Sequence, residues 1–301
     1  MQKISTSTFT VLDAPGIGDE NGIRLLAKAG FEALDYGFFY LSEDPRFRMS
    51  DEAHTKYYKN LRAIADDCGI EIHQAHSPMP NYLYTGDESL DNIYMQLQIK
   101  AMKAASILGA TYIVIHPVIL KEDRRTPERG EPLREKCQEI NYKYYSRLKP
   151  FCEEYGIKIA VENMFNWDPD AQKICPTVCS TAAEMKAYVD MMGCDWFVNC
   201  LDIGHAVLTG SKPQDMIREL GDYIGCLHVH DNDGIHDLHQ APHTGIIEWK
   251  EVMQALREIG YHGVFNMEAD MFFYGYGTRL FPETTHLLYR IGQDLVEFEG
   301  K

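Results

Sequence analysis

The sequence predicts an α/β protein that folds as a single (β/α)8 barrel. Eight short apolar runs with β-strand character alternate along the chain with longer amphipathic stretches. No Ser- or Gly-rich linker interrupts this alternation, so we expect residues 1–301 to form one domain. Several of the runs also end in a carboxylate or a histidine, at the strand ends where such a barrel places its active site.

The predicted strands are short and mostly apolar. In chain order they cover residues 5–12, 32–36, 70–76, 112–116, 157–162, 196–202, 225–231 and 263–268. Six amphipathic stretches between them are typical of helices, and most end in Gly, a common helix C-cap: 21–30, 55–69, 97–109, 142–156, 181–192 and 249–260. An open, doubly wound sheet is the main alternative, but the chain lacks a Gly-rich phosphate-binding turn after its first strand.

Side chains that can bind metal ions close the third to the eighth predicted strand. They are His76, His116, Glu162, Asp202, His228 and Glu268. In a barrel these strand ends share one mouth, so we expect the last four side chains to converge on one cation. Unrelated polar strand ends are the alternative explanation. Further candidates follow the strands in the loops: His205, Asp237 and His239.

Composition excludes several classes of protein. The chain has 45 acidic and 29 basic residues, a net charge of −16, which disfavours binding to nucleic acid. No apolar run is long enough to cross a bilayer, and the N-terminus lacks the apolar core of a secretory signal. We therefore expect a cytoplasmic protein that binds no membrane. The eight cysteines match no disulfide or metal-binding spacing, so we expect reduced thiols.

Five segments together resemble the xylose isomerase-like TIM barrel superfamily, which contains sugar and sugar-phosphate isomerases and epimerases, inosose dehydratases and endonuclease IV. The segments are VEN at 161–163, LDIGH at 201–205, LHVHD at 227–231, DLHQAPHTGIIEW at 237–249 and the Glu of NME at 268. The resemblance covers nearly the whole chain and implies a metal-dependent sugar isomerase or epimerase.

By this resemblance, Glu162, Asp202, His228 and Glu268 hold one divalent cation. Oxygen-rich ligation favours Mn²⁺, with Mg²⁺, Co²⁺ or Zn²⁺ as alternatives. Glu162 and Glu268 are then the catalytic pair that moves a proton beside a carbonyl, through an enediolate that the metal stabilises.

The resemblance also implies a set of side chains around the substrate. The substrate-binding candidates are His76, His116, His205, Trp167, Asp237 and His239, and the aromatic candidates for stacking on a sugar include Tyr82, Tyr84 and Phe272. For each of them a purely structural role is the competing interpretation. The candidate phosphate-binding loops are DNDG at 231–234 and YGYG at 274–277, and the acidic DNDG loop is poorly suited to bind phosphate, so we expect a small, unphosphorylated sugar, polyol or keto-sugar.

Two other activities stay open. A dehydratase or lyase acting on an inosose or keto-sugar would use the same metal and base. An endonuclease IV-type nuclease with three zinc ions would use nine ligands, and the chain has a candidate at each of these positions, but the expected mouth loops carry acidic and aromatic residues rather than Lys and Arg. The HVHDND segment at 228–233 also lacks the Gly-Glu pair and following Arg of ketose 3-epimerases, which argues against 3-epimerisation of a free ketohexose. Family members are commonly homo-oligomers, and the aromatic segment 272–281 is a candidate lid or interface.

Overall fold

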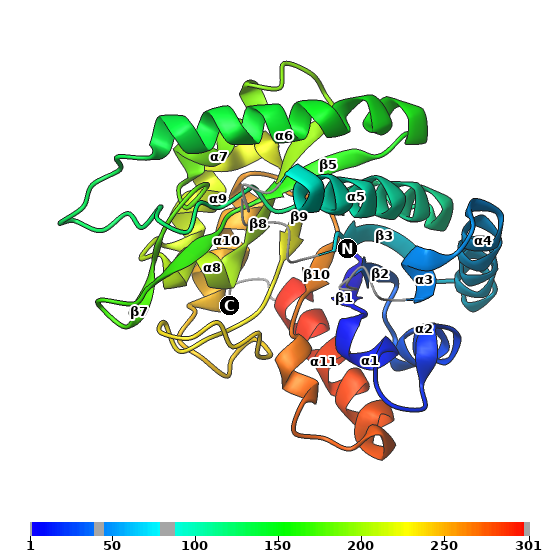
Figure 1. Ribbon diagram of the computed structural model, residues 1–301. Helices are drawn as coiled ribbons and strands as arrows, with labels where there is room; N and C mark the ends of the chain where they lie inside the picture. The colour runs from blue at the N-terminus through cyan, green and yellow to red at the C-terminus, as the bar shows by residue number, and fades with distance from the viewer. Residues whose placement is uncertain (1, 39–44, 79–87, 298–301) are drawn as a thin grey trace.

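A computed structural model describes residues 2–38, 45–78 and 88–297. Eight parallel strands form one sheet in the order β10-β1-β2-β3-β4-β5-β8-β9 (Figure 1). They are β1 (Ile4–Ser7), β2 (Ala33–Gly37), β3 (Glu71–His76), β4 (Tyr112–Val114), β5 (Lys158–Glu162), β8 (Phe197–Asp202), β9 (Ile224–His228) and β10 (Phe265–Met267). Just beyond β9, the Val229 N–H donates to the Asn266 carbonyl at 2.9 Å and the Glu268 N–H donates to the Val229 carbonyl at 3.0 Å. These bonds join β9 and β10, the two edge strands of the sheet, so the predicted barrel is confirmed.

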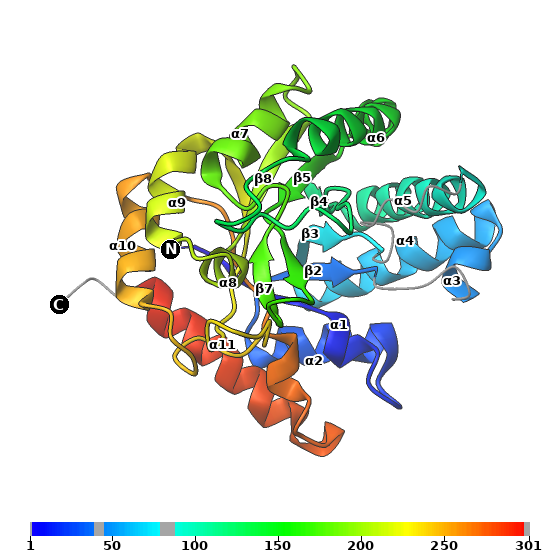
Figure 2. The same cartoon turned by 60° about the vertical axis from the view of Figure 1, so that its left-hand side comes forward.

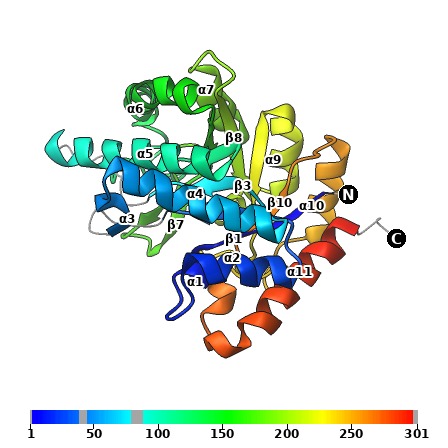
Figure 3. The same cartoon turned by 90° about the vertical axis from the view of Figure 1, so that its right-hand side faces the viewer.

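Helices surround the strands on the outside (Figure 2). They are α1 (Phe9–Leu12), α2 (Gly18–Ala29), α3 (Pro45–Arg48), α4 (Asp51–Cys68), α5 (Glu88–Leu108), α6 (Arg134–Tyr155), α7 (Ala182–Asp190), α8 (Ile203–Leu208), α9 (Pro213–Leu220), α10 (Trp249–Glu258) and α11 (Phe281–Glu297). Three short 3-10 helices cover Gly221–Tyr223, Asp270–Phe273 and Thr278–Leu280. The last helix, α11, packs beside α2 near the start of the chain and so completes the helical layer (Figure 3).

The first predicted strand is too long. The strand ends at Ser7, and the apolar residues after it form α1, in which the Leu12 N–H donates to the Thr8 carbonyl at 2.9 Å. Leu12 packs against Gly22 of α2 so closely that a Cβ on this glycine would lie 2.5 Å from the Leu12 Cδ1 atom. A short apolar run fits a strand or a helical turn equally well, and this contact with α2 selects the helix.

An antiparallel hairpin, which the sequence did not predict, follows β5. It consists of β6 (Phe165–Asp168) and β7 (Lys173–Pro176), outside the main sheet. The ring of Phe165 lies against that of His205, with centroids 4.9 Å apart. The hairpin therefore reaches the carboxyl end of the barrel, where the candidate site lies.

The barrel interior changes character along the strands. Near its middle, four small side chains pack together, one each from β4, β5, β8 and β9: Val114, Ala160, Cys200 and Cys226. Because strand side chains alternate, the residue two positions later on each strand also points inward. Those four positions hold His116, Glu162, Asp202 and His228. The β-strand period thus stacks a layer of ionisable side chains directly on an apolar layer.

All eight cysteines are free thiols, as the sequence predicted. Within the described residues, none of the helices combines the length and the apolar character that a membrane span requires. The single domain and the cytoplasmic location stay predictions.

Candidate metal centre

The four predicted metal ligands lie together at the carboxyl ends of their strands. Ligand atoms of Glu162, Asp202, His228 and Glu268 all lie within 4.8 Å of one another. All four residues are buried, with at most 4% of the residue surface exposed. The structure therefore brings together the set that the sequence singled out.

His228 lies at the centre of this group. Its Nδ1 atom is 3.1 Å from Glu162 Oε1, 3.0 Å from Glu268 Oε2 and 3.9 Å from Asp202 Oδ2. Burial alone would raise the pKa values of both glutamates, but His228 offsets it, together with His116 at Glu162 and His239 at Glu268. The pKa of Glu162 is held well below its usual range and that of Glu268 is lowered to about 2. These contacts with histidines favour the ionised form of both glutamates.

The donor set fits a divalent cation. Three buried carboxylates so close together repel one another unless positive charge lies between them. Glu162 Oε2 is buried, and imidazole nitrogens of His116 and His76 lie 2.9 and 3.6 Å from it. Carboxylate oxygens with one imidazole nitrogen are suitable ligands for Mn²⁺, Mg²⁺, Co²⁺ or Zn²⁺, and no thiolate among the four favours zinc.

The third and fourth strands add two histidines on the other side of Glu162. His116 Nε2 lies 2.9 Å from Glu162 Oε2, and His76 Nε2 lies 3.0 Å from His116 Nε2. His76 also forms a possible three-ligand group with Glu162 and His228. Both histidines face the cavity, so they are placed to contact a substrate or a second cation.

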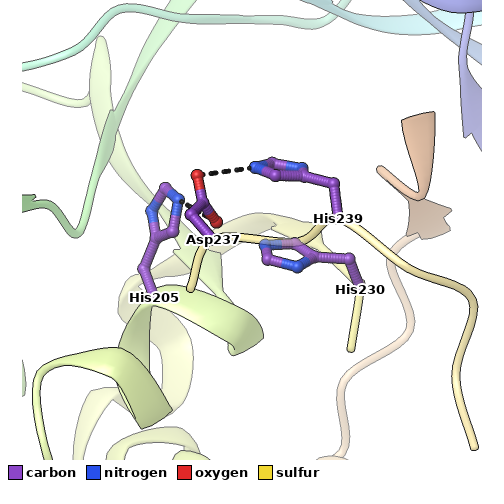
Figure 4. A group of neighbouring side chains, drawn as sticks. All are labelled: His205, His230, Asp237 and His239. Atoms are coloured by element: carbon purple, nitrogen blue, oxygen red, sulfur yellow. Dashed lines mark hydrogen bonds and ion pairs between the residues drawn. The ribbon is translucent and has the colours of Figure 1, made fainter. Parts of the chain in front are cut away.

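A second cluster lies beside the metal centre, and we call it the histidine cluster. It contains His205, His230, Asp237 and His239, whose ligand atoms also lie within 4.8 Å of one another. Figure 4 shows Asp237 between the rings of His205 and His239. Asp237 Oδ1 lies 3.6 Å from His205 Nε2, and Asp237 Oδ2 lies 3.1 Å from His239 Nε2.

Main-chain carbonyl groups fix two of these rings. The Nδ1 atom of His205 lies 2.9 Å from the Asn163 carbonyl, and that of His239 lies 3.0 Å from the Glu268 carbonyl. Each ring therefore turns its Nε2 atom toward Asp237. The His239 backbone has a φ of 41°, a strained value for a residue with a side chain, as is common at functional sites.

Within the histidine cluster, the carboxylate and the imidazoles stabilise one another's charged forms. Burial would lower the pKa of His205, but Asp202 and Asp237 overcome this effect and raise it to about 10. Asp237 likewise raises the pKa of His239 well above its usual range, and the two histidines together hold the pKa of Asp237 well below its own. The cluster can therefore hold positive charge, either as protons or as a metal ion.

Both clusters open into one cavity of about 280 Å³. Pockets for small molecules start near roughly 300 Å³, so this volume suits a small substrate. The lining residues are Phe9, His76, His116, Glu162, Met164, Phe165, His205, Asp237, His239, Glu268, Asp270 and Met271. None of them is a lysine or an arginine.

The predicted aromatic contacts are placed differently. Trp167 is 46% exposed on the β6–β7 hairpin and is not among the lining residues, whereas Phe165 of the same hairpin is. Phe272 packs against the hydrophobic core. Tyr82 and Tyr84 lie outside the described residues.

Sequence reasoning missed two ionisable groups. His230 is fully buried, its Nε2 atom lies 3.1 Å from Asp202 Oδ2, and its ring stacks on His239 with centroids 3.9 Å apart. Asp270 lines the cavity and accepts a hydrogen bond from Ser7 Oγ at 3.1 Å. Each lies two positions after a predicted ligand but beyond the end of its strand, where the β-strand period no longer assigns the direction of a side chain.

Comparison with known proteins identifies the same family as the motifs. A sequence model for the family described as xylose isomerase-like TIM barrel matches residues 23–272. An uncharacterized protein of Methanocaldococcus jannaschii is 28% identical over 217 residues, which are 71% of this chain and 69% of that protein. The resemblance inferred from the sequence is confirmed.

Solved structures share the fold. A D-psicose 3-epimerase determined in the presence of D-fructose has a TM-score of 0.73 at 17% identity, over 99% of this chain and 100% of that chain. The IOLI protein, whose structure has a zinc atom, has a TM-score of 0.73 at 18% identity, over 99% of each chain. At these identities the likeness establishes the architecture.

Proposed function

Because this chain belongs to the xylose isomerase-like TIM barrel family, we propose that it is a divalent-metal-dependent sugar isomerase or epimerase. One observation carries the proposal: two buried glutamates, Glu162 and Glu268, line the same small cavity, with their carboxylates 3.1 and 3.0 Å from His228 Nδ1. Isomerising or epimerising a sugar beside a carbonyl requires a base that removes a proton from carbon and an acid that returns it. A pair of carboxylates on one cavity is suited to both steps.

The roles of the chain's own residues follow from their positions. Glu162 removes the proton and Glu268 returns it, or the reverse, according to the face of the substrate carbon. His116 and His205 lie next to Glu162 in the cavity lining and bind substrate hydroxyls or the carbonyl oxygen. Asp237 and His239 bind the more distant hydroxyls.

Glu162, Asp202, His228 and Glu268 would hold the cation. When bound, a divalent cation stabilises the negative charge that develops on a substrate oxygen next to the reacting carbon. We propose Mn²⁺ because oxygen donors dominate the set, with Mg²⁺, Co²⁺ and Zn²⁺ as alternatives. The zinc atom in the IOLI structure supports a divalent ion in this fold.

The cavity favours an uncharged substrate. Among the described residues, its lining has four imidazoles, four carboxylates and four apolar side chains, and no lysine or arginine that would bind a phosphate group. We therefore propose an unphosphorylated sugar, polyol or keto-sugar. The epimerase relatives named for free ketoses support this class. A dehydratase or lyase acting on an inosose or keto-sugar begins with the same proton removal and is the alternative reaction.

The experiment that tests this function combines metal analysis with isotope exchange. We expect the purified protein to bind about one divalent ion per chain, because the carboxylate-rich group of Glu162, Asp202, His228 and Glu268 supplies the four ligands of one centre. The metal-loaded protein is then incubated in deuterated water with free ketoses, aldoses and inososes, and carbon-bound deuterium is measured by NMR. Exchange into one substrate without water loss supports an isomerase or epimerase, and exchange with water loss identifies the dehydratase. Absence of exchange in all substrates by a metal-loaded protein would contradict the proposal.

A second candidate function rests on the number of ligand groups. Three groups of potential ligands lie within one site, including the histidine cluster. This favours a trinuclear zinc site of the endonuclease IV type, which would cleave DNA at abasic sites. The lack of lysine and arginine in the cavity lining, as far as the structure describes it, and the net charge of −16 oppose it. Binding of three zinc ions per chain together with cleavage of an abasic duplex would establish this function instead.

A further inference from the structure

A buried aspartate on β2 faces the side of His228 that turns away from the proposed cation. Oδ2 of Asp35 lies 3.2 Å from His228 Nε2, whereas the opposite ring nitrogen, Nδ1, faces Glu162 and Glu268. Asp35 is 1% exposed and His228 is fully buried. Asp35 lies within its strand rather than at the end, so the pattern of polar strand ends does not include it.

Amide side chains from the neighbouring strands fix the Asp35 carboxylate. Nε2 of Gln74 and Nδ2 of Asn266 donate to Asp35 Oδ2 at 2.9 and 3.0 Å. Asn266 is fixed in turn, because its Oδ1 accepts from Ser5 Oγ at 2.8 Å. All of these side chains are buried, so four strands together determine the position of one carboxylate.

The two ring nitrogens of His228 have different roles in the proposed metal centre. A neutral imidazole carries a proton on one nitrogen and a lone pair on the other. Nδ1 must offer its lone pair if it is to bind the cation, so Nε2 must carry the proton. Among the described residues no group meets the full geometry of a hydrogen bond with Nε2. Its ion-pair partner is the carboxylate of Asp35.

We propose that Asp35 is a positioning residue: it holds the proton on His228 Nε2 and so directs Nδ1 to the metal. A carboxylate behind a ligand histidine also increases the basicity of the ligand. This inference rests on the proposed metal centre and extends it by one residue outside the ligand set. Asp35 is not among the residues that line the cavity, so its proposed role is exerted through His228.

The test compares D35N with D19N. The D35N substitution preserves the size of the side chain but removes its negative charge. Asp19 is the matched control, since it is also a buried aspartate and accepts hydrogen bonds from the hydroxyls of Tyr36, at 2.8 Å, and Tyr57, yet lies outside the cavity lining. Affinity for Mn²⁺ is measured by isothermal titration calorimetry and stability by thermal unfolding without metal. We expect D35N to bind Mn²⁺ about 10- to 100-fold more weakly than wild type, and D19N to lose stability with unchanged affinity.

A measurement on the wild-type protein makes the test independent of the variants. Nitrogen-15 NMR of the Zn²⁺-loaded protein, with His228 assigned through H228Q, is expected to show a protonated Nε2 and a metal-bound Nδ1. The inference is overturned if the ring binds the metal through Nε2, or if D35N matches wild-type affinity within about twofold. Failure of the wild type to bind any divalent ion would instead overturn the proposed function.

Discussion

The metal centre and the histidine cluster share one cavity but differ in their donors and in their support. The metal centre has three carboxylates and one imidazole, all from strand ends and almost fully buried. The histidine cluster has three imidazoles and one carboxylate, and three of its members, His230, Asp237 and His239, come from the segment between β9 and α10. The Asp237 and His239 side chains there are 26% and 20% exposed.

The difference assigns different tasks to the two regions. A site on strand ends is rigid, which suits groups that hold a cation and transfer protons. A site on a loop varies more easily without loss of the fold, which suits groups that select a substrate. We therefore expect substitutions in the metal centre to abolish the reaction and substitutions in the histidine cluster to alter substrate affinity.

The largest effect is expected for E162Q and E268Q. Each change removes a proton-transfer group and a metal ligand, and general acid–base catalysis alone contributes about 10²- to 10⁴-fold in rate. Both variants should keep the wild-type circular dichroism spectrum, because the fold rests on the apolar layers around the barrel. Turnover is measured by deuterium exchange at saturating metal. Near-normal rates in both variants would remove the distinction between the two regions.

A smaller effect is expected for H239Q and D237N. These variants should still bind one cation per chain, while KM rises about tenfold as one hydrogen bond to substrate is lost. H236Q is the matched control, since His236 lies in the same loop but is 64% exposed and bonds to Asp233. Loss of one metal ion per chain in D237N would show that the histidine cluster is itself a metal site.

D270N sharpens the boundary between the regions. Asp270 follows Glu268 and lines the cavity, but it lies outside both clusters and bonds to Ser7. We expect unchanged metal affinity and a KM increase of about three- to tenfold, since one polar contact to a neutral hydroxyl contributes about 1 kcal/mol. Calorimetry and steady-state kinetics separate these readouts, and a weaker metal affinity in D270N would place Asp270 in the metal centre.

The smallest effect concerns a buried histidine far from the carboxylate-rich site. Burial and two nearby lysines lower the pKa of His54 from 6.5 to about 4, the opposite of the rise at His205 among carboxylates. In the unfolded chain His54 takes up a proton near pH 6.5, whereas in the folded chain it stays neutral down to about pH 4. The contribution of neutral His54 to the stability of the fold is therefore complete above pH 6.5 and is lost as the pH falls toward 4. The free energy of unfolding, measured with urea at about pH 7 and about pH 5, should fall less between these pH values for H54Q than for wild type. Equal losses in the two proteins would contradict this prediction.

The sequence by itself determined the barrel and the four proposed ligands. Strand side chains alternate strictly, so a polar residue that ends an apolar run is assigned to the interior of the barrel without any knowledge of its neighbours. The positions of Glu162, Asp202, His228 and Glu268 follow from that local rule. The same rule failed at residues 9–12, where contact with Gly22 of α2 makes a helix of an apolar run.

Only the tertiary structure decided what surrounds these ligands. The approach of Asp35 to His228, the placement of Asp237 between two histidines, and the inclusion of Phe165 rather than Trp167 in the cavity each join segments far apart in the chain. The strand period tells which way a side chain points, but not which side chain of another strand or loop it meets. Those distances depend on the closure of the barrel and on the path of its loops, and neither leaves a local pattern in the sequence.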